Sequence, residues 1–190
     1  MKRVSVVGCS GAGKTAVARR LAEVLGVSHV ELDALHWGPN WSAATSVELH
    51  DRVSAAVDAD GWVVDGNYQG KIGTLVWQRA DTVVWIDPPK WRVMGQALCR
   101  TVRRVVTRQE LWNGNRENWD ALFVWRGDES ILAWAWRSHP RIRARYEAAM
   151  VDPRYEHLVF HRLPTRMSVD RFADSVGRHN PDPRDESLGG

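Results

Sequence analysis

The chain has 190 residues, of which 44% are hydrophobic, and this length and composition suit one globular domain with a sizeable core. No apolar run approaches the ~18 residues of a membrane span, the first residues lack the cleavage site of a secretory signal, and two cysteines are too few for a disulfide framework. We therefore expect a soluble, cytoplasmic protein without a membrane segment.

The formal net charge of +3 hides an uneven distribution of charge along the chain. Residues 100–145 contain ten arginines, no lysine and five acids, so this segment carries +5 and the remainder carries −2. The planar guanidinium of arginine binds phosphate through two parallel hydrogen bonds, whereas lysine acts as a point charge. The segment is therefore predicted to bind an anion.

The expected elements alternate between strand and helix. Short apolar runs predict buried strands at residues 4–7, 29–32, 62–64, 82–86 and 158–160. Helical spacing of apolar residues, with capping signals at the ends, predicts helices that begin near residues 14, 45, 88, 131 and 168. The tail from Gly177 is rich in Pro, Asp and Gly and is predicted to be disordered, which leaves residues 1–177 as one domain.

This alternation predicts an α/β fold in which helices cover both faces of a parallel sheet. In such sheets, ligands bind beyond the C-terminal ends of the strands. The residues that directly follow the expected strands are therefore the first candidates for function: residues 8–15, Asp33, Asp65 and Asp87.

Residues 8–15 read GCSGAGKT and fit the phosphate-binding pattern G-x-x-x-x-G-K-[ST]. In such a loop, backbone N–H groups surround the phosphates, the lysine reaches the outer phosphates and the Ser or Thr hydroxyl binds Mg²⁺. The helix that begins here adds the positive end of its dipole. The sequence therefore predicts a phosphate and Mg²⁺ site formed by Gly8, Ser10, Gly11, Ala12, Gly13, Lys14 and Thr15.

Two aspartates follow later strands and are interpreted differently. Asp65 can hold a water of the Mg²⁺ shell beside Thr15, or the Asp-Gly pair that it begins can simply shape a turn; we favour the metal-side role. Asp87 is expected to be structural, as the cap of the helix that two prolines open.

The arginine-rich segment has three interpretations. It can form a mobile lid, at about residues 105–130, that stabilises the charge of the γ-phosphate through Arg100, Arg104, Arg108 and Arg116. Alternatively, its arginines can form a nucleic-acid surface together with interleaved aromatic rings, which are those of Trp112, Trp119, Trp125, Trp134 and Trp136. The third interpretation is that Trp134 and Trp136 only pack in the core or the lid. We favour the lid.

The stretch ELDALHW at residues 31–37 places Asp33 and His36 on one side of a single turn. Beside the phosphate loop, Asp33 can bind a substrate hydroxyl, take its proton during transfer, or orient a metal-bound water. His36 can contact the substrate or only pack beside Trp37. The predicted acceptor site consists of Asp33, His36, Trp37, Asp65, Asn67 and Tyr68.

Four motifs, GCSGAGKT, ELDALHWGPNW, VVDGNYQG and ADTVVWIDPPKW, resemble in order and spacing the adenylate-kinase-like P-loop proteins called DNA topology modulation proteins of the flagellin-regulation type. The resemblance covers residues 1–104 well and the rest more loosely. Its broader family contains nucleoside monophosphate, shikimate and gluconate kinases. It implies a three-layer sandwich around a five-stranded parallel sheet of order 2-3-1-4-5, with ATP and Mg²⁺ at the loop, an acceptor site after strand two, and a lid.

The resemblance also implies roles for single residues. Arg100 matches the arginine that ends the helix before the lid and lies on the ATP side in adenylate kinases. Asp65 matches the aspartate of the DG element of nucleotide kinases. Asp33 matches an aspartate that faces the acceptor in gluconate kinases.

The sequence therefore predicts a Mg²⁺-dependent kinase that transfers the γ-phosphate of ATP to a hydroxyl of a small acceptor, with catalysis by Lys14, Asp33, Arg100, Arg104 and Arg116. One alternative is a nucleoside monophosphate kinase, although the Phe-Pro-Arg that follows DG in those enzymes is replaced here by Asn-Tyr-Gln. Another is an ATP-binding regulatory or nucleic-acid-associated protein.

Overall fold

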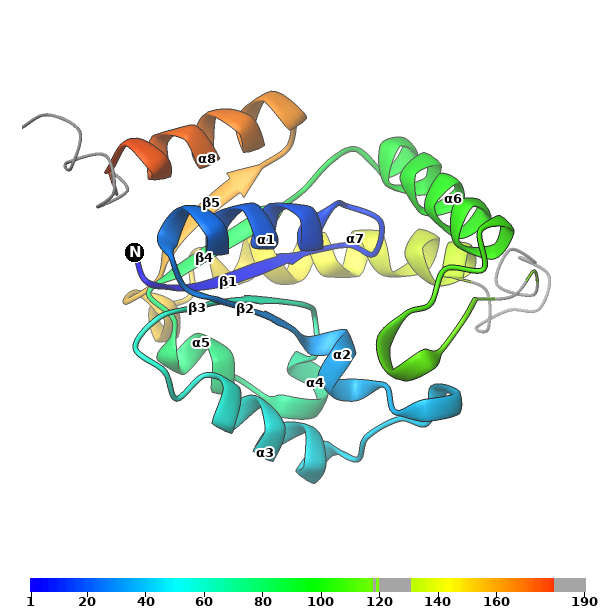
Figure 1. Ribbon diagram of the computed structural model, residues 1–190. Helices are drawn as coiled ribbons and strands as arrows, with labels where there is room; N and C mark the ends of the chain where they lie inside the picture. The colour runs from blue at the N-terminus through cyan, green and yellow to red at the C-terminus, as the bar shows by residue number, and fades with distance from the viewer. Residues whose placement is uncertain (118, 120–130, 180–190) are drawn as a thin grey trace, which may run out of the picture.

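The computed structural model describes residues 1–117, 119 and 131–179 (Figure 1). Five strands form one sheet: β1 (Arg3–Gly8), β2 (Ser28–Glu31), β3 (Trp62–Asp65), β4 (Thr82–Ile86) and β5 (Val159–Leu163). Every pair of neighbouring strands is parallel, and the order is β2-β3-β1-β4-β5. The expected parallel sheet and its order are confirmed.

The helices connect these strands. They are α1 (Lys14–Leu25), α2 (Leu32–His36), α3 (Ser46–Ala56), α4 (Gln69–Ile72), α5 (Leu75–Arg79), α6 (Lys90–Val106), α7 (Ile131–Ala149) and α8 (Arg166–His179), with short 3-10 turns η1 (Pro39–Trp41), η2 (Trp112–Gly114) and η5 (Pro153–Tyr155). None of the helices in the described part of the chain is long and apolar enough to cross a membrane.

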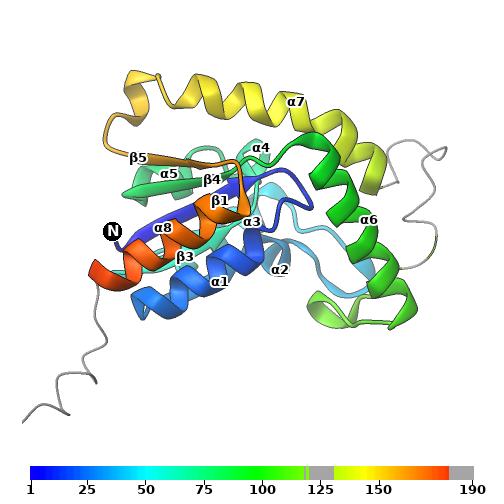
Figure 2. The ribbon, with the colours of Figure 1, turned by 90° about the horizontal axis from the view of Figure 1, so that it is seen from above.

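The two faces of the sheet bury different layers of helices, because successive strand residues point to opposite sides. Val4 and Val6 pack with α1 and α8, whereas Val7 and Trp85 pack with α3, α5 and α7. Figure 2 shows α7 on one side of the sheet and α1 and α8 on the other. This burial on both faces explains why the strands are continuous apolar runs without alternation.

Several local signals act as the sequence predicts. Thr45 and Glu48 form the capping box of α3, with the Glu48 amide donating to Thr45 Oγ1 and the Thr45 amide donating to the Glu48 carboxylate. Gly26 ends α1 in the left-handed conformation, at φ 66°. These caps fix the ends of the helices that flank the site.

Two boundaries differ from expectation by a change in the type of element. Leu32, which was assigned to the second strand, begins α2, so Asp33 lies in a helical turn. α8 continues to His179, so Gly177 is helical and does not begin a tail; residues 180–190 lie outside the described residues. The apolar pattern shows where an element lies, but its end depends on the neighbours against which it packs.

Asp87 does not cap α6, contrary to our expectation. Pro89 occupies the N-cap position of that helix. The Asp87 carboxylate instead accepts from the Arg162 guanidinium at 2.5 Å and lies 3.8 Å from Arg143. Asp87 is therefore structural, as expected, but it acts by joining the ends of β4 and β5 to α7.

Candidate active site

Residues 8–15, which we call the P-loop, connect β1 to α1, and Gly8 and Gly13 are two of the positions where the loop requires glycine. A Cβ on Gly8, at φ 146°, would stand 2.3 Å from the Ile86 carbonyl oxygen, so no larger residue fits there. Gly13 is the N-cap of α1 at φ 93°, in the left-handed region that L-residues rarely adopt. Inside the loop the Ala12 amide donates to the Cys9 carbonyl at 3.0 Å. The predicted loop is therefore formed at the C-terminal end of the central strand.

Lys14 lies inside this loop, with Nζ donating to the Cys9 carbonyl oxygen at 3.1 Å. Burial lowers the pKa of Lys14 below its ordinary value, and the negative charges of Asp33 and Asp65 partly offset that effect. Asp33 and Asp65 thus both lie within electrostatic reach of the P-loop lysine. A phosphate bound here would favour the charged amine further.

Asn67 binds the first residue of the P-loop. Its Nδ2 donates to the Gly8 carbonyl, and its Oδ1 accepts from the Gly8 amide at 3.3 Å and from the Tyr146 hydroxyl at 2.8 Å. Both ends of the amide are therefore engaged by protein groups. Sequence reasoning placed Asn67 against the acceptor and missed Tyr146, since nothing local to α7 marks a residue whose partner lies 79 positions away.

Asp33 and Tyr68 are brought together, and the Tyr68 hydroxyl donates to Asp33 Oδ1 at 2.6 Å. Burial, followed by the charge of Asp33, raises the pKa of Tyr68, so the phenol keeps its proton and remains a donor. The bond fixes one oxygen of the carboxylate. Tyr68, which was predicted to bind substrate, thereby also positions Asp33.

His36 is packed between aromatic rings. It is 3% exposed, its ring centroid lies 4.6 Å from that of Trp37 and 4.8 Å from that of Tyr68, and Nδ1 has no hydrogen-bond partner among the described residues. Burial and the nearby Lys71 lower the pKa of His36. Its geometry favours the packing interpretation. Lys71, which sequence reasoning missed, lies with Nζ 3.4 Å from His36 Nε2.

Asp65 ends β3 between β1 and β2, in register with Val6 and Glu31. It is 4% exposed, and Oδ2 has no hydrogen-bond partner among the described residues, although it lies 3.6 Å from His29 Nε2. A buried carboxylate oxygen without a donor is the feature that a cation or its water shell would satisfy. The metal-side role of Asp65 stays a prediction, and its unpartnered oxygen is consistent with it.

The residues present fit a bound Mg²⁺ that is shared with phosphates. No group of three or more His, Cys, Asp or Glu side chains in residues 1–117, 119 and 131–179 could hold a metal by itself. Mg²⁺ in phosphoryl-transfer sites usually takes one or two protein oxygens and completes its shell with water and substrate phosphates. The Asp65 carboxylate, with the Thr15 hydroxyl at the start of α1, matches that pattern.

The predicted lid arginines occupy different places. Arg100 reaches the P-loop, where Nη2 donates to Ser10 Oγ at 3.4 Å, and burial together with the charge of Arg104 lowers its pKa. Arg104 forms a largely buried ion pair with Glu117 at 2.8 Å. The Arg116 side chain is 57% exposed and lies 3.7 Å from Glu110, so its described contacts do not include the P-loop.

The segment after α6 packs on the segment that follows β2. We call residues 110–117 the post-α6 loop and residues 31–42 the acceptor segment. Asn115 is 4% exposed; its Oδ1 accepts from the Trp41 amide at 2.8 Å, and its Nδ2 donates to the Gly38 carbonyl at 2.9 Å. Trp112 Nε1 donates to the Glu31 carboxylate at 2.7 Å. The two segments are thus hydrogen-bonded together.

The predicted lid is described only in part. Residues 118 and 120–130 lie outside the described residues, as do Trp125 and the side chain of Trp134. Trp119 and Trp136 are both more than half exposed, and Lys90 Nζ lies 3.3 Å from the centroid of the Trp136 ring. That contact is a cation–π interaction.

No family model matches the chain, and no curated protein sequence matches it. Among solved structures, the chain is similar to a shikimate kinase from Acinetobacter baumannii in complex with shikimate, at 16% identity and a TM-score of 0.52, over 93% of this chain and 90% of that one. It is also similar to a gluconokinase from Sinorhizobium meliloti 1021, at 17% identity and a TM-score of 0.47, over 94% and 97% of the two chains.

The first likeness shows that this chain shares the fold of that structure. It agrees with the sheet order and with the P-loop at the end of β1. The resemblance to the DNA topology modulation proteins, which the sequence motifs carry, stays a prediction.

Proposed function

We propose that this protein is a Mg²⁺-dependent kinase that transfers the γ-phosphate of ATP to a hydroxyl of a small acceptor. One observation carries the proposal. Burial lowers the pKa of both Lys14 and Arg100, and Asp33, held by Tyr68, lies close enough to both for its charge to oppose that lowering, so a proton acceptor shares one site with the phosphate-binding cations.

Each residue would have a distinct task. The P-loop amides and Lys14 would hold the phosphates, and Arg100 would stabilise the charge that spreads over the transferred group. Asp33 would bind the acceptor hydroxyl through its second oxygen and receive its proton. Thr15 and Asp65 would hold Mg²⁺, whose charge neutralises phosphate oxygens when bound.

The likeness to a shikimate kinase supports this class, because that structure holds a small hydroxylated acid. A nucleoside monophosphate kinase is less well supported. The Phe-Pro-Arg that follows the DG element in those enzymes is replaced here by Asn67, Tyr68 and Gln69, so the arginine that binds their acceptor nucleotide has no counterpart at that position.

The first test is an ADP-release screen of the purified protein with MgATP against nucleotides, sugar acids, cyclitols and amino alcohols. We expect one hydroxylated class to raise ADP production above the background hydrolysis. A rise with AMP, CMP, GMP or UMP would instead establish the nucleoside monophosphate kinase. If no compound of the panel raised ADP release above the background hydrolysis, the kinase proposal would be wrong.

Two substitutions test the assigned roles. Lys14→Ala should abolish turnover, whereas Asp33→Asn should keep ATP binding and lower turnover by about a hundredfold or more, because only the proton acceptor is lost. Asp51→Asn, exposed on α3, is the matched control and should behave as wild type. Wild-type turnover by Asp33→Asn would show that its assigned role is wrong.

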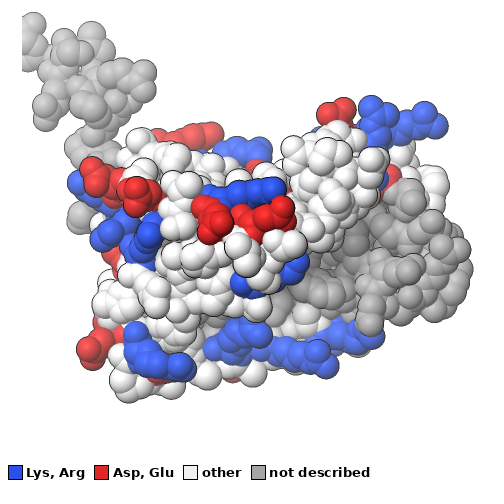
Figure 3. Space-filling model, turned by 90° about the horizontal axis from the view of Figure 1, so that it is seen from below, with Lys and Arg blue, Asp and Glu red and all other residues white. Residues whose placement is uncertain are grey.

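The competing class is a nucleic-acid-associated protein. On the face seen in Figure 3, acidic and basic side chains lie side by side, and basic side chains form a row along the lower edge. Such a protein should bind DNA or RNA with an affinity that falls steeply with salt. The kinase should show no such binding at physiological salt.

A further inference from the structure

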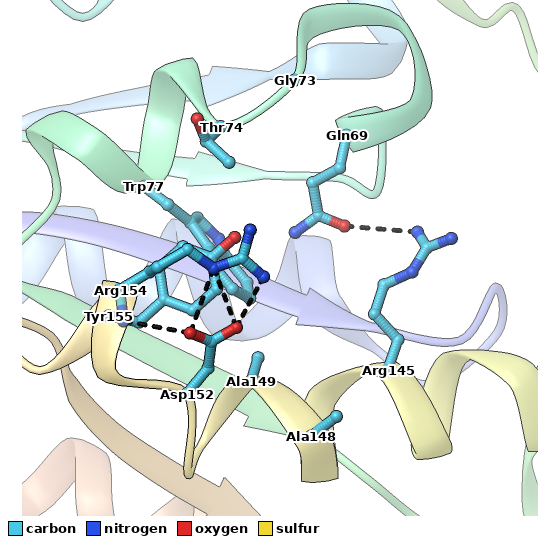
Figure 4. A pocket seen from close by; sticks show the side chains of 10 residues that line it. All are labelled: Gln69, Gly73, Thr74, Trp77, Arg145, Ala148, Ala149, Asp152, Arg154 and Tyr155. Atoms are coloured by element: carbon cyan, nitrogen blue, oxygen red, sulfur yellow. Dashed lines mark hydrogen bonds and ion pairs between the residues drawn. The ribbon is translucent and has the colours of Figure 1, made fainter.

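A cavity of about 380 Å³ opens between α4, α5 and the C-terminal end of α7 (Figure 4). Gln69 and Arg145 lie on one side of the gap, and Trp77, Tyr155 and the Asp152–Arg154 pair lie on the other. The volume is that of a small-molecule site. No residue of the P-loop or of the acceptor segment lines it, so it is separate from the candidate active site.

The lining carries one cation that no carboxylate neutralises. Arg154 and Asp152 neutralise each other through several bonds, the shortest at 2.6 Å. Arg145 forms no ion pair within the described residues, and its hydrogen bond to the Gln69 side-chain oxygen is long, at 3.5 Å. The cavity therefore presents a guanidinium that has no carboxylate partner among the described residues, which favours an anionic group in its ligand.

The rest of the lining is apolar and aromatic. The rings of Trp77 and Tyr155 meet edge to face with centroids 4.9 Å apart, and the indole N–H of Trp77 is used inside the core, where it donates to Ser5 Oγ at 3.2 Å. Ala148 and Ala149 add small apolar side chains on α7. A flat apolar ring fits such a surface better than a polar chain does.

Two of the lining residues adjoin the residues that hold the P-loop. Gln69 follows Tyr68 in the chain, and Arg145 precedes Tyr146. Tyr146 donates to Asn67, and Asn67 binds Gly8. A ligand that draws Gln69 and Arg145 together would act on both elements that position the first residue of the P-loop.

We propose that this cavity is a second small-ligand site, which takes an anion carrying an apolar ring, such as an aromatic carboxylate or phosphate monoester, and that its occupancy alters nucleotide binding at the P-loop. The guanidinium of Arg145 binds the anion, and the Trp77–Tyr155 wall contacts the ring.

The test is a saturation-transfer NMR titration with phenyl phosphate and benzoate, compared with inorganic phosphate and benzyl alcohol. Arg145→Glu reverses the charge at the rim, and Ala148→Trp fills the cavity. Arg141→Glu, exposed on α7 outside the lining, is the matched control. The titration is repeated in a Lys14→Ala chain, so that binding of phenyl phosphate at the P-loop is recognised.

We expect the two ring anions to bind more tightly than either comparator. Their dissociation constants should rise about tenfold or more in Arg145→Glu and Ala148→Trp and stay unchanged in Arg141→Glu. Arg145 is exposed, so its substitution tests the site even where Ala148→Trp disturbs folding. Failure of both ring anions to bind, equal binding of benzyl alcohol, or wild-type binding by Arg145→Glu would overturn the site.

The effect of the bound ring anion on the P-loop is tested separately, by measuring MgADP affinity. A saturating ring anion should change the dissociation constant of MgADP, and by reciprocity MgADP should change that of the anion by the same factor. Asn67→Ala should remove this mutual effect while leaving the anion bound. An unchanged MgADP affinity in the presence of the anion would overturn the coupling.

Discussion

At the scale of single residues, Asn67 shows how one side chain can hold a loop. Its amide pairs with both backbone groups of Gly8, and Tyr146, a fully buried residue of α7, supports it from behind. A P-loop binds phosphates through backbone amides, so its affinity depends on the loop being held in shape before the ligand arrives. Asn67 and Tyr146 provide that support.

Removing this support should weaken both the fold and nucleotide binding. Asn67→Ala removes the side-chain acceptor of the Gly8 amide and one partner of the Tyr146 hydroxyl, which should cost about 1–3 kcal/mol of unfolding free energy, and Tyr146→Phe removes the bond to Asn67 and should cost about 1 kcal/mol. Urea unfolding and MgADP titration measure the two effects. An MgADP affinity equal to that of wild type in Asn67→Ala would show that Asn67 does not support nucleotide binding at the P-loop.

His36 should make stability depend on pH. Its pKa in the fold is lowered from the ordinary value of 6.5 by burial and by Lys71, with Asp33 opposing them. The unfolded chain therefore binds this proton more readily, and the free energy of unfolding falls as the pH drops through 6.5 toward the folded-state pKa.

His36→Gln should remove this contribution. The variant should lose less unfolding free energy than wild type between about pH 7 and pH 5, as measured by urea unfolding. Burial also lowers the pKa of His161, but that histidine remains in both proteins and cancels in the comparison. His50→Gln, exposed on α3, is the control. Parallel curves for wild type and His36→Gln would contradict the assignment.

At the scale of elements, the post-α6 loop and the acceptor segment form one unit. Asn115 and Trp112 connect η2 to the backbone around η1 and to the end of β2. The same loop is tied to α6 by the Arg104–Glu117 pair, one turn beyond Arg100. Movement of the acceptor segment should therefore displace the helix that carries Arg100.

Asn115→Ala should separate the two segments. The Trp41 amide loses its acceptor, so its hydrogen exchange should accelerate by about tenfold or more, and burying unpaired backbone groups should cost about 1–3 kcal/mol. Exchange mass spectrometry of the peptide containing Trp41 measures this. Asn113→Gly removes a bond from an exposed side chain to the Trp37 carbonyl, keeps the positive φ of 56° at that position, and is the control. Equal hydrogen exchange of the Trp41 peptide in the two variants would show that Asn115 does not hold the two segments together.

At the scale of the whole molecule, the P-loop joins the two layers of the fold. It leaves β1 at the centre of the sheet and enters α1 on one face, while Asn67 and Tyr146 hold it from the other. The binding site therefore exists only when both layers are in their native arrangement. A ligand bound at the loop should stabilise the entire domain for that reason.

MgATP should raise the thermal stability of the whole protein. At about a hundred times its dissociation constant, a ligand of the native state adds ~2.7 kcal/mol, which corresponds to roughly 5–10 °C for a chain of this size. EDTA and Thr15→Ala should each reduce the shift, and Lys14→Ala should remove most of it. Differential scanning fluorimetry measures all four conditions, and an equal shift in Lys14→Ala would place the nucleotide elsewhere.

The sequence by itself determined the sheet and the position of the P-loop. Short apolar strands between amphipathic helices imply a covered parallel sheet, and GCSGAGKT carries its glycines and Lys14 within eight positions. Such features are encoded locally, because each depends on the spacing of neighbouring residues. The sheet order came from the resemblance of the motifs, and the structure confirms it.

Only the tertiary structure decided which side chains meet. The bonds of Asn67 to Gly8 span 59 positions, and the bond of the Trp41 amide to Asn115 spans 74. A lone asparagine in a loop carries no local pattern that names a distant partner, so Asn67 was assigned to the acceptor and Asn115 was missed. The lowered pKa of Lys14 and the burial of His36 also depend on distant elements, because solvent exclusion is a property of the packed fold.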